Sequence, residues 1–347
     1  MKKIMMIGDV HAQISNLQQM FKLFTFIAEQ ARHHKVDSVL FLGDIYHTHA
    51  VLRQEVINMV QKGFMGIASH AQIDPKHVIT LVGNHDGYTP TSIELNALSL
   101  TLPNHTVITH PISVGSFVLM PYYADHTKFI EEANKLGEPD KILVCHQTFN
   151  GAAYENGFYA PDGIDHKQLN YYRIISGHIH ARQQFDNVIY LGTPLSANSG
   201  DYVTLSDKET YKCIWIYDLE KNVIDGIPTM NKVKNTYKVN LPQDTEMMDQ
   251  LTPEFIKENE IKVFFNGSKE DYLEVQKKYG ISCKYTHVTP QTKKVKKTLN
   301  SETVYSNIQS AFEMYFKEIV SGSPEEKDLL WKKVQQAQKM LGTSNIS

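Results

Sequence analysis

Residues 4–11 of the chain read IMMIGDVH, four apolar residues followed at once by a glycine, an aspartate, a valine and a histidine. A short apolar run that ends at glycine is typical of a buried strand. Asp9 and His11 stand two positions apart, which places both side chains on the same side of an extended backbone. The stretch therefore predicts a strand that delivers two polar side chains at its carboxyl end.

The same pattern recurs along the first half of the chain. Strands are predicted at residues 39–42 and 78–82, and between the strands apolar residues recur at helical spacing over 17–31 and 52–67. This β-α-β-α-β order favours parallel strands covered by helices. Further strands are predicted at residues 117–120, 142–145, 173–176, 188–191 and 213–217. That number of strands fits an α/β sandwich built on two sheets.

Polar motifs follow these predicted strands. They are the stretches 7–11 (IGDVH), 42–47 (LGDIYH), 82–86 (VGNHD), 144–146 (VCH) and 176–180 (SGHIH). In open α/β sheets, ligands bind beyond the carboxyl ends of the strands. The motifs are therefore expected to converge on one edge of the fold.

The motifs together offer carboxylates, imidazoles and one amide oxygen. That mixed set suits manganese, iron or zinc better than calcium. If Asp9 and Asp44 are the only anionic ligands, two divalent ions would leave a positive surplus of about two charges that attracts a phosphate. Of the 16 histidines in the chain, those outside the motifs, among them His33, His34 and His70, are assigned no role.

The charge, the cysteines and the apolar runs of the chain limit which classes of protein it can belong to. The net charge is −3, whereas a free-standing nucleic-acid binder is usually basic, so a DNA substrate would require a local basic patch, the metal ions or a partner. The three cysteines, Cys145, Cys213 and Cys283, are widely spaced, which argues against a disulfide framework and against a cysteine zinc site. No apolar run reaches the roughly 20 residues that span a membrane, and the first one ends too early for a signal peptide. We therefore expect a soluble, cytoplasmic protein without membrane contact.

The sequence pattern changes after about residue 225. A strand at 261–265, a helix at 268–279 and a strand at 281–288 predict a small α/β unit. Clustered lysines follow, and then two amphipathic helices. We therefore divide the chain into a catalytic domain at 1–225, a small α/β unit at 226–290, a basic linker at 291–300 and a helical segment at 301–347.

The order D-x-H, G-D, G-N-H-D, a lone histidine and G-H-x-H resembles the calcineurin-like metallophosphoesterase superfamily. The resemblance implies a four-layer α-β-β-α sandwich and a site with two divalent metal ions. The ligands that it implies are Asp9, His11 and His180 for one ion, Asn84, His146 and His178 for the other, and Asp44 as the bridge.

The second motif points to one branch of that superfamily. Residues 43–47, GDIYH, resemble the Gly-Asp-aliphatic-aromatic-His form of the SbcD and Mre-eleven nucleases, whereas phosphoprotein phosphatases carry Asp-Arg-Gly there. His47 then matches an active-site histidine linked to exonuclease activity. His85 would stabilise the transition state or protonate the leaving oxygen, and Asp86 would orient it. The stretch 188–194 resembles the strand and the Gly-Ser/Thr-Pro segment that follow G-H-x-H in the same nuclease family. The continuation at 199–201 and the compact length resemble the recombination-nuclease subunits of large tailed phages.

This resemblance implies a manganese-dependent DNA nuclease that acts in DNA end processing, repair and recombination. Residues 226–290 would form a capping domain that helps to bind DNA. The C-terminal helices would dock on an SbcC-type ATPase, and the chain would form a homodimer, in the cytoplasm of a bacterial host if it is phage-encoded. The helices could equally pack on their own protein. Two alternatives are a phosphodiesterase or phosphatase for nucleotides and other small substrates, and a scaffold without catalysis, against which the intact ligand set argues.

Overall fold

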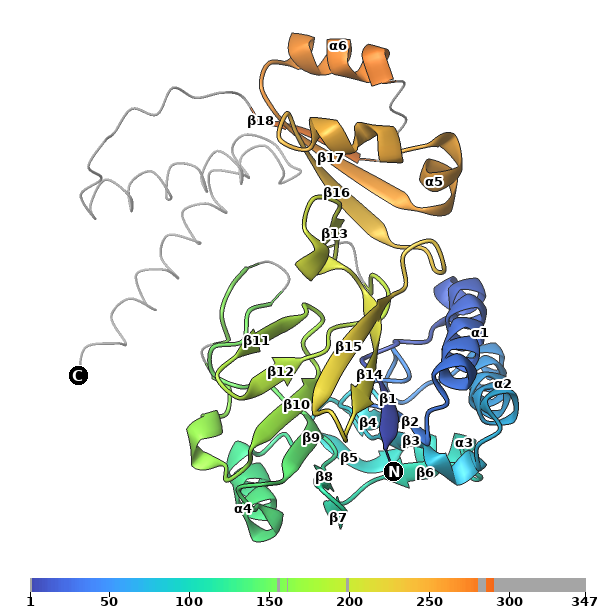
Figure 1. The fold of residues 1–347 in the computed structure, drawn as a ribbon, viewed down its shortest axis with the longest axis vertical. Coiled ribbons are helices and arrows are strands. Elements are labelled where there is room, and N and C mark those ends of the chain that lie inside the picture. The colour runs from blue at the N-terminus through green and yellow to red at the C-terminus, as the bar shows by residue number, and fades with distance from the viewer. Residues whose placement is uncertain (1, 155–156, 161, 198–199, 280–284, 290–347) are drawn as a thin grey trace, which may run out of the picture. The chain divides into compact units, whose positions relative to one another are not determined.

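The computed structural model describes residues 2–154, 157–160, 162–197, 200–279 and 285–289 (Figure 1). The basic linker and the C-terminal helices expected from the sequence lie outside these residues. All of the described residues fall in one compact unit, Met1–Gln291.

The first of two six-stranded sheets contains the strands predicted from the N-terminal half. Its strand order is β15 (Val223–Pro228), β14 (Cys213–Asp218), β1 (Lys3–Ile7), β2 (Ser38–Phe41), β3 (Val78–Leu81) and β6 (Thr106–Ile108). Strands β1, β2 and β3 run parallel, and helices α1 (Leu17–His34) and α2 (Gln54–Ala71) connect them. The β-α-β-α-β order predicted from apolar spacing is confirmed.

The second six-stranded sheet is built from the middle of the chain. Its strand order is β11 (Gln183–Phe185), β12 (Val188–Tyr190), β10 (Arg173–Gly177), β9 (Ile142–His146), β8 (Phe117–Leu119) and β7 (Ile112–Val114). Helix α4 (His126–Leu136) joins β8 to β9, and Asp125 caps it by accepting hydrogen bonds from two backbone N–H groups. The apolar stripe of α4 is short, since its buried residues are only Phe129 and Ala133, and the sequence did not predict this helix.

Buried side chains alternate between separate cores along the strands. On β1, Met5 lies in the core beneath α1 and α2, whereas the neighbouring Ile4 lies in a core shared with Val144 of the second sheet. A further core, which includes Phe129 of α4, covers the other face of the second sheet. The layers are therefore helix, sheet, sheet, helix, which confirms the predicted α-β-β-α sandwich (Figure 1).

A smaller sheet has four parallel strands and its own core. Its strands are β13 (Val203–Thr204), β16 (Thr236–Leu241), β17 (Glu260–Asn266) and β18 (Tyr285–Thr289), accompanied by helices α5 (Pro253–Glu258) and α6 (Lys269–Tyr279). Strand β15 runs across the expected domain boundary at Asp225, and β13 comes from the part of the chain before it. Two parts of the chain therefore contribute strands to the smaller sheet.

The remaining elements are short. They are the hairpin β4 (Gly87–Thr89) and β5 (Ser92–Asn96), helix α3 (Leu98–Thr101), and 3-10 helices at Ile14–Asn16, Pro75–His77, His166–Gln168, Lys208–Thr210 and Thr245–Gln250. No helix in the described part of the chain combines the length and the apolar character that crossing a membrane requires.

Candidate metal centre

The expected metal ligands follow the carboxyl ends of strands in both six-stranded sheets. In chain order they are Asp9 and His11 after β1, Asp44 after β2, Asn84 after β3, His146 at the end of β9, and His178 and His180 after β10. Strands β1, β2 and β3 are parallel to one another, as are β9 and β10, so these ends share an edge. The structure brings all of these side chains together there.

Three of the residues have a left-handed backbone, which is uncommon for residues other than glycine. The φ angle is +48° at His11, +51° at Asp44 and +76° at His178. Such conformations cost free energy and persist only where the surrounding fold imposes them, and they cluster at functional sites. All three residues are expected metal ligands, which indicates that the loop conformations direct these side chains into the site.

Two glycines in the motifs allow the backbone to approach the ligands closely. A Cβ atom on Gly83 would lie 2.2 Å from Asp44 Oδ1, and one on Gly177 would lie 2.7 Å from Asp9 Oδ1. Neither distance is compatible with a side chain, so only glycine fits at these positions.

One cluster of donor atoms surrounds His146. Its Nε2 lies 3.0 Å from Asn84 Oδ1, 3.3 Å from His178 Nδ1 and 3.4 Å from Asp44 Oδ2. Asn84 Oδ1 is also 2.9 Å from His178 Nδ1. Two ligands at right angles around an ion, each about 2.1 Å from it, stand about 3.0 Å apart. The spacing therefore suits donors around a single cation.

A second cluster contains Asp9, His11 and His180, whose ligand atoms lie within 4.8 Å of one another. His11 Nε2 is 3.0 Å from His180 Nε2, and His180 Nε2 is 4.0 Å from Asp9 Oδ2. Asp44 Oδ2 lies 3.8 Å from His11 Nε2 in this cluster, as well as close to the first one. Asp44 thus occupies the position of a bridging ligand.

The hydrogen-bonding chemistry of these atoms also fits a cation. His146 Nδ1 lies 2.8 Å from the backbone oxygen of Leu42, which can only accept, so Nδ1 carries the proton. In the neutral ring, Nε2 then carries a lone pair, which faces the side-chain oxygens of Asn84 and Asp44. Acceptors that face one another are stable only with a proton or a cation among them. A histidine held by a backbone carbonyl in this way is the usual arrangement of a metal ligand.

The family model for calcineurin-like phosphoesterases matches residues 2–182, more than half of the chain. This chain belongs to the calcineurin-like phosphoesterase family. The matched stretch contains all of the motifs that form the two clusters. The family uses divalent metal ions, in agreement with the donor groups found here.

Two curated relatives of the phosphoesterase come from viruses. One is 078R, a candidate phosphoesterase of Invertebrate iridescent virus 3, which is 26% identical over 216 residues, 58% of this chain and 59% of the relative. The other is exonuclease subunit 1 of Enterobacteria phage T4, which is 26% identical over 216 residues, 58% of each chain. The similarity thus covers less than two thirds of the length of either relative.

Burial and charge set the protonation of the phosphoesterase centre. Burial lowers the pKa values of His11 and His178 to about 3, so both rings are neutral and carry lone pairs at neutral pH. Burial raises the pKa of Asp9 to about 6. Burial acts against charge at Asp44 and His146 as well, but their mutual attraction outweighs it, lowering the pKa of Asp44 and raising that of His146 to about 10. The site therefore stabilises positive charge beside its carboxylates.

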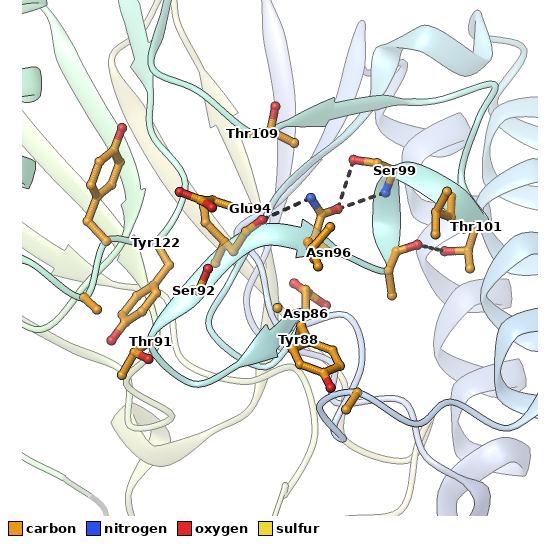
Figure 2. Close-up of a pocket in the computed structure, with 18 of the residues that line it drawn as sticks. Asp86, Tyr88, Thr91, Ser92, Glu94, Asn96, Ser99, Thr101, Thr109 and Tyr122 are labelled. Atoms are coloured by element: carbon orange, nitrogen blue, oxygen red, sulfur yellow. Dashed lines mark hydrogen bonds between the residues drawn. The ribbon is translucent and has the colours of Figure 1, made fainter.

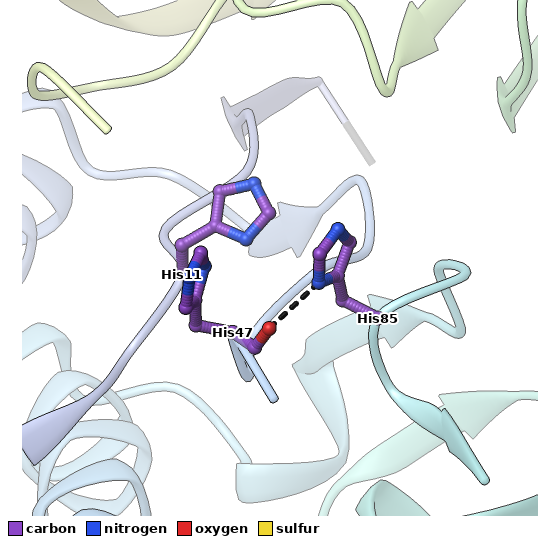
Figure 3. Close-up of side chains that lie close together, drawn as sticks. All are labelled: His11, His47 and His85. Carbon is purple, nitrogen blue, oxygen red and sulfur yellow. Dashed lines mark hydrogen bonds between the residues drawn. The ribbon is translucent and has the colours of Figure 1, made fainter. Parts of the chain in front are cut away.

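His47 and His85 stand beside His11, and Figure 3 shows these three imidazoles grouped together. The His85 ring is held through Nδ1, which lies 2.7 Å from the backbone oxygen of His47. Asp86 accepts hydrogen bonds from the backbone N–H groups of Tyr46 and Gly83, each at 3.0 Å. Asp86 therefore holds the two loops together through backbone N–H groups, and the carbonyl of His47 is a hydrogen-bond partner of the His85 ring.

A cavity of about 1150 Å³ adjoins the phosphoesterase centre (Figure 2). The hairpin β4–β5 forms much of its lining, and Asp86 and Tyr122 line it on the side of the metal ligands. The Tyr122 ring stacks on that of His178, with centroids 5.9 Å apart. The cavity thus offers space for a substrate group next to His178, although none of its lining residues is an expected metal ligand.

Sequence reasoning did not find the groups that support the ligands. The carbonyls of Leu42 and His47 have no sequence signal, because every residue carries a carbonyl group. Tyr122 lies shortly after strand β8 of the second sheet, in residues 120–123 (MPYY). Its place after a strand at the ligand-bearing edge is a signal that could have identified it.

Proposed function

We propose that the chain is a manganese-dependent DNA nuclease subunit that hydrolyses phosphodiester bonds at a site for two metal ions. The observation that carries this proposal is the convergence of both donor clusters on the carboxylate of Asp44, with His47 and His85 beside them. The proposed ligands are Asp9, His11 and His180 for one ion, Asn84, His146 and His178 for the other, and Asp44 for both. Bound there, divalent ions supply Lewis acidity toward a phosphate and lower the pKa of water.

The proposed role of His85 is to assist the departing sugar oxygen. Because its Nδ1 donates to the carbonyl of His47, Nε2 is the nitrogen available to a substrate. The backbone N–H of His85 also donates to Asp44 Oδ1 at 2.8 Å, which ties the position of the ring to the bridging carboxylate. In the imidazolium form, in which both ring nitrogens carry a proton, Nε2 of His85 can donate a hydrogen bond or a proton to an oxygen beside the ions.

The smaller sheet supports a nucleic-acid substrate. Lys238 Nζ lies 5.4 Å from the ring centroid of Tyr202 and 4.8 Å from that of Phe264, and Lys262 Nζ lies 5.8 Å from that of Tyr202. These side chains are half-buried, on the face of the sheet opposite its core. Aromatic rings beside cations are typical of surfaces that bind nucleic-acid strands. Lys238 and Lys262 form a local basic patch, although the net charge of the whole chain is −3.

The second proposal, hydrolysis of a nucleotide or another small phosphodiester, is favoured by the cavity beside Asp86 and Tyr122. A small substrate would not need the lysines of the smaller sheet. Lys238→Glu with Lys262→Glu should therefore lower DNA cleavage about tenfold or more, because a nucleic-acid interface depends on phosphate contacts, and should leave hydrolysis of bis-p-nitrophenyl phosphate unchanged. Equal activity of this double variant and the wild type on DNA would favour the small-substrate proposal.

The site itself is tested by nuclease assays on linear duplex DNA with manganese. Asp44→Asn and His85→Ala are each expected to reduce cleavage about a hundredfold or more, since one removes the bridging charge and the other the leaving-group contact. Asp125→Asn is the matched control, because Asp125 caps α4 and asparagine caps a helix as well as aspartate does. Wild-type rates in both site variants would contradict the proposed roles.

We also propose that residues 301–347 bind an SbcC-type ATPase and that the chain forms a homodimer. The resemblance of the second motif to the SbcD nucleases and the name of the phage T4 relative, an exonuclease subunit, support an assembly of several subunits. Removal of residues 299–347 should abolish capture of the ATPase and leave metal content unchanged. Capture that survives the truncation would refute this docking site.

A further inference from the structure

His49 stands two positions after His47, and the sequence offers no role for it. In the structure its ring is half-buried and stacks on that of His85, with centroids 4.8 Å apart and ring planes 19° apart. His49 Nδ1 lies 3.2 Å from the backbone oxygen of Gly87. Because a carbonyl only accepts, this nitrogen donates, and the bond anchors the His49 ring to the loop that carries His85.

The contacts of His49 complement those of His47. His47 accepts a hydrogen bond from His85 Nδ1 at 2.7 Å, which fixes one atom of the His85 ring. That hydrogen bond alone leaves the ring free to tilt about the line that joins donor and acceptor. The His47 ring also lies nearly parallel to the His85 ring, with centroids 5.6 Å apart, but the His49 ring is the nearer of the two. A flat ring stacked against His85 opposes that tilt, and stacked aromatic pairs have a preferred geometry.

We infer that His49 is a positioning residue that holds the plane of the His85 imidazole so that Nε2 faces the substrate. This inference rests on the proposed function, in which His85 assists the leaving oxygen. A catalytic group must be held within a narrow range of orientations, and a small misplacement lowers the rate of the chemical step more than it lowers substrate binding.

Three substitutions distinguish the contribution of the flat His49 ring from that of its hydrogen bond to Gly87. His49→Phe keeps a flat ring, His49→Asn keeps a donor for Gly87, and His49→Ala removes both. If stacking positions His85, Asn and Ala lower kcat about tenfold with KM within about twofold, and Phe restores kcat to within about threefold of the wild type. Restoration by Asn and not by Phe, or a loss expressed only in KM, would overturn the inference.

A double-mutant cycle tests whether His49 acts through His85. His49→Ala should cost about tenfold in the wild-type background and nothing further in His85→Ala, because the ring that it positions is then absent. Equal losses in both backgrounds would overturn the inference. If His85→Ala alone retained wild-type activity, the proposed function of His85 would fail instead, so the two failures are distinguishable.

His105→Ala is the matched control for removal of a histidine. The His105 ring also bonds a backbone oxygen, that of Pro75 at 2.9 Å, and contacts an aromatic ring, that of Phe64, but it lies outside the metal centre. The control should keep kcat within about twofold of the wild type, and the His49 variants should keep the wild-type content of bound manganese. Loss of manganese from the His49 variants, with activity falling in proportion, would assign His49 to metal retention and overturn the inference.

Discussion

At the scale of single residues, the centre depends on which atom of each side chain carries a proton. The His146 proton is directed to the carbonyl of Leu42, and His85 Nδ1 donates to that of His47. The side-chain types were readable from the sequence, whereas these partners were not, because backbone carbonyls acquire roles only through the fold.

The protonation of His146 predicts that metal binding depends on pH. Asp44 and Asp9 outweigh burial and raise the pKa of His146 to about 10, so below that pH an ion must displace a proton from the ring. Metal affinity should therefore rise about tenfold per pH unit between about pH 7 and pH 9. In the ion-free protein the same shift stabilises the fold below pH 6.5 and is lost as the pH rises through about 10.

Calorimetric titration with manganese, in buffers that differ in ionisation enthalpy, measures this proton release. His33→Ala serves as a control for the general effect of losing an imidazole, because His33 lies in the last turn of α1. Affinity that is constant from pH 6 to pH 9 would contradict the prediction.

A second residue-scale prediction concerns the leaving group. If His85 assists the departing oxygen, His85→Ala should slow DNA cleavage about a hundredfold and slow hydrolysis of bis-p-nitrophenyl phosphate far less, since nitrophenolate departs without a proton. Equal losses on both substrates, measured as kcat, would show that His85 acts on the phosphate rather than on the leaving oxygen.

At the scale of elements, the loops after the strands require glycine at particular points. Gly83→Ala places a Cβ atom 2.5 Å from the backbone nitrogen of Asp44, so we expect loss of metal and destabilisation of several kcal/mol, on the order of other overpacked sites. Gly66→Ala in α2 is the matched control, because nothing lies within 4 Å of its Cβ, and it should stabilise the helix by up to about 1 kcal/mol. Thermal unfolding and metal analysis of both variants provide the measurement.

Prediction from sequence succeeded for many elements with a strong apolar period, although β16, on which Tyr237, Val239 and Leu241 alternate into a core, was not predicted. Helices α1 and α2 and strands β1 to β3 were predicted because buried residues recur along them. Helix α4 and the hairpin β4–β5 were not predicted, because few of their side chains are buried. Strand β13 has only two residues, Val203 and Thr204, and its pairing with β16 is a long-range contact that no local pattern encodes.

At the scale of the whole molecule, a buried ion pair ties the start of β14 to the loop that carries His180. Lys212 forms an ion pair with Asp201, both almost fully buried, and donates to Thr193 Oγ1 at 2.9 Å and to the backbone oxygen of His180 at 3.2 Å. The pair therefore supports the loop that carries an expected metal ligand. Its burial could not be read from the sequence, because no local pattern shows that Lys212 and Asp201 face one another inside the fold.

Breaking this pair should destabilise the whole fold. Lys212→Met leaves the carboxylate of Asp201 buried without its cation, so we expect a loss of about 3–5 kcal/mol in the free energy of unfolding, together with weaker metal binding near His180. The exposed pair of Lys135 and Glu132 provides the comparison, since Lys135→Met should cost less than about 1 kcal/mol. Denaturant unfolding measures both, and similar small losses would show that the buried pair contributes little.

The left-handed backbone at His11, Asp44 and His178 has a consequence for how ions enter the centre. Such unfavourable conformations persist only where the surrounding structure holds them. We therefore expect an incoming ion to meet donors that already stand in position, without a rearrangement of the main chain. Chelation should accordingly empty the centre and leave the peptide path of these turns unchanged.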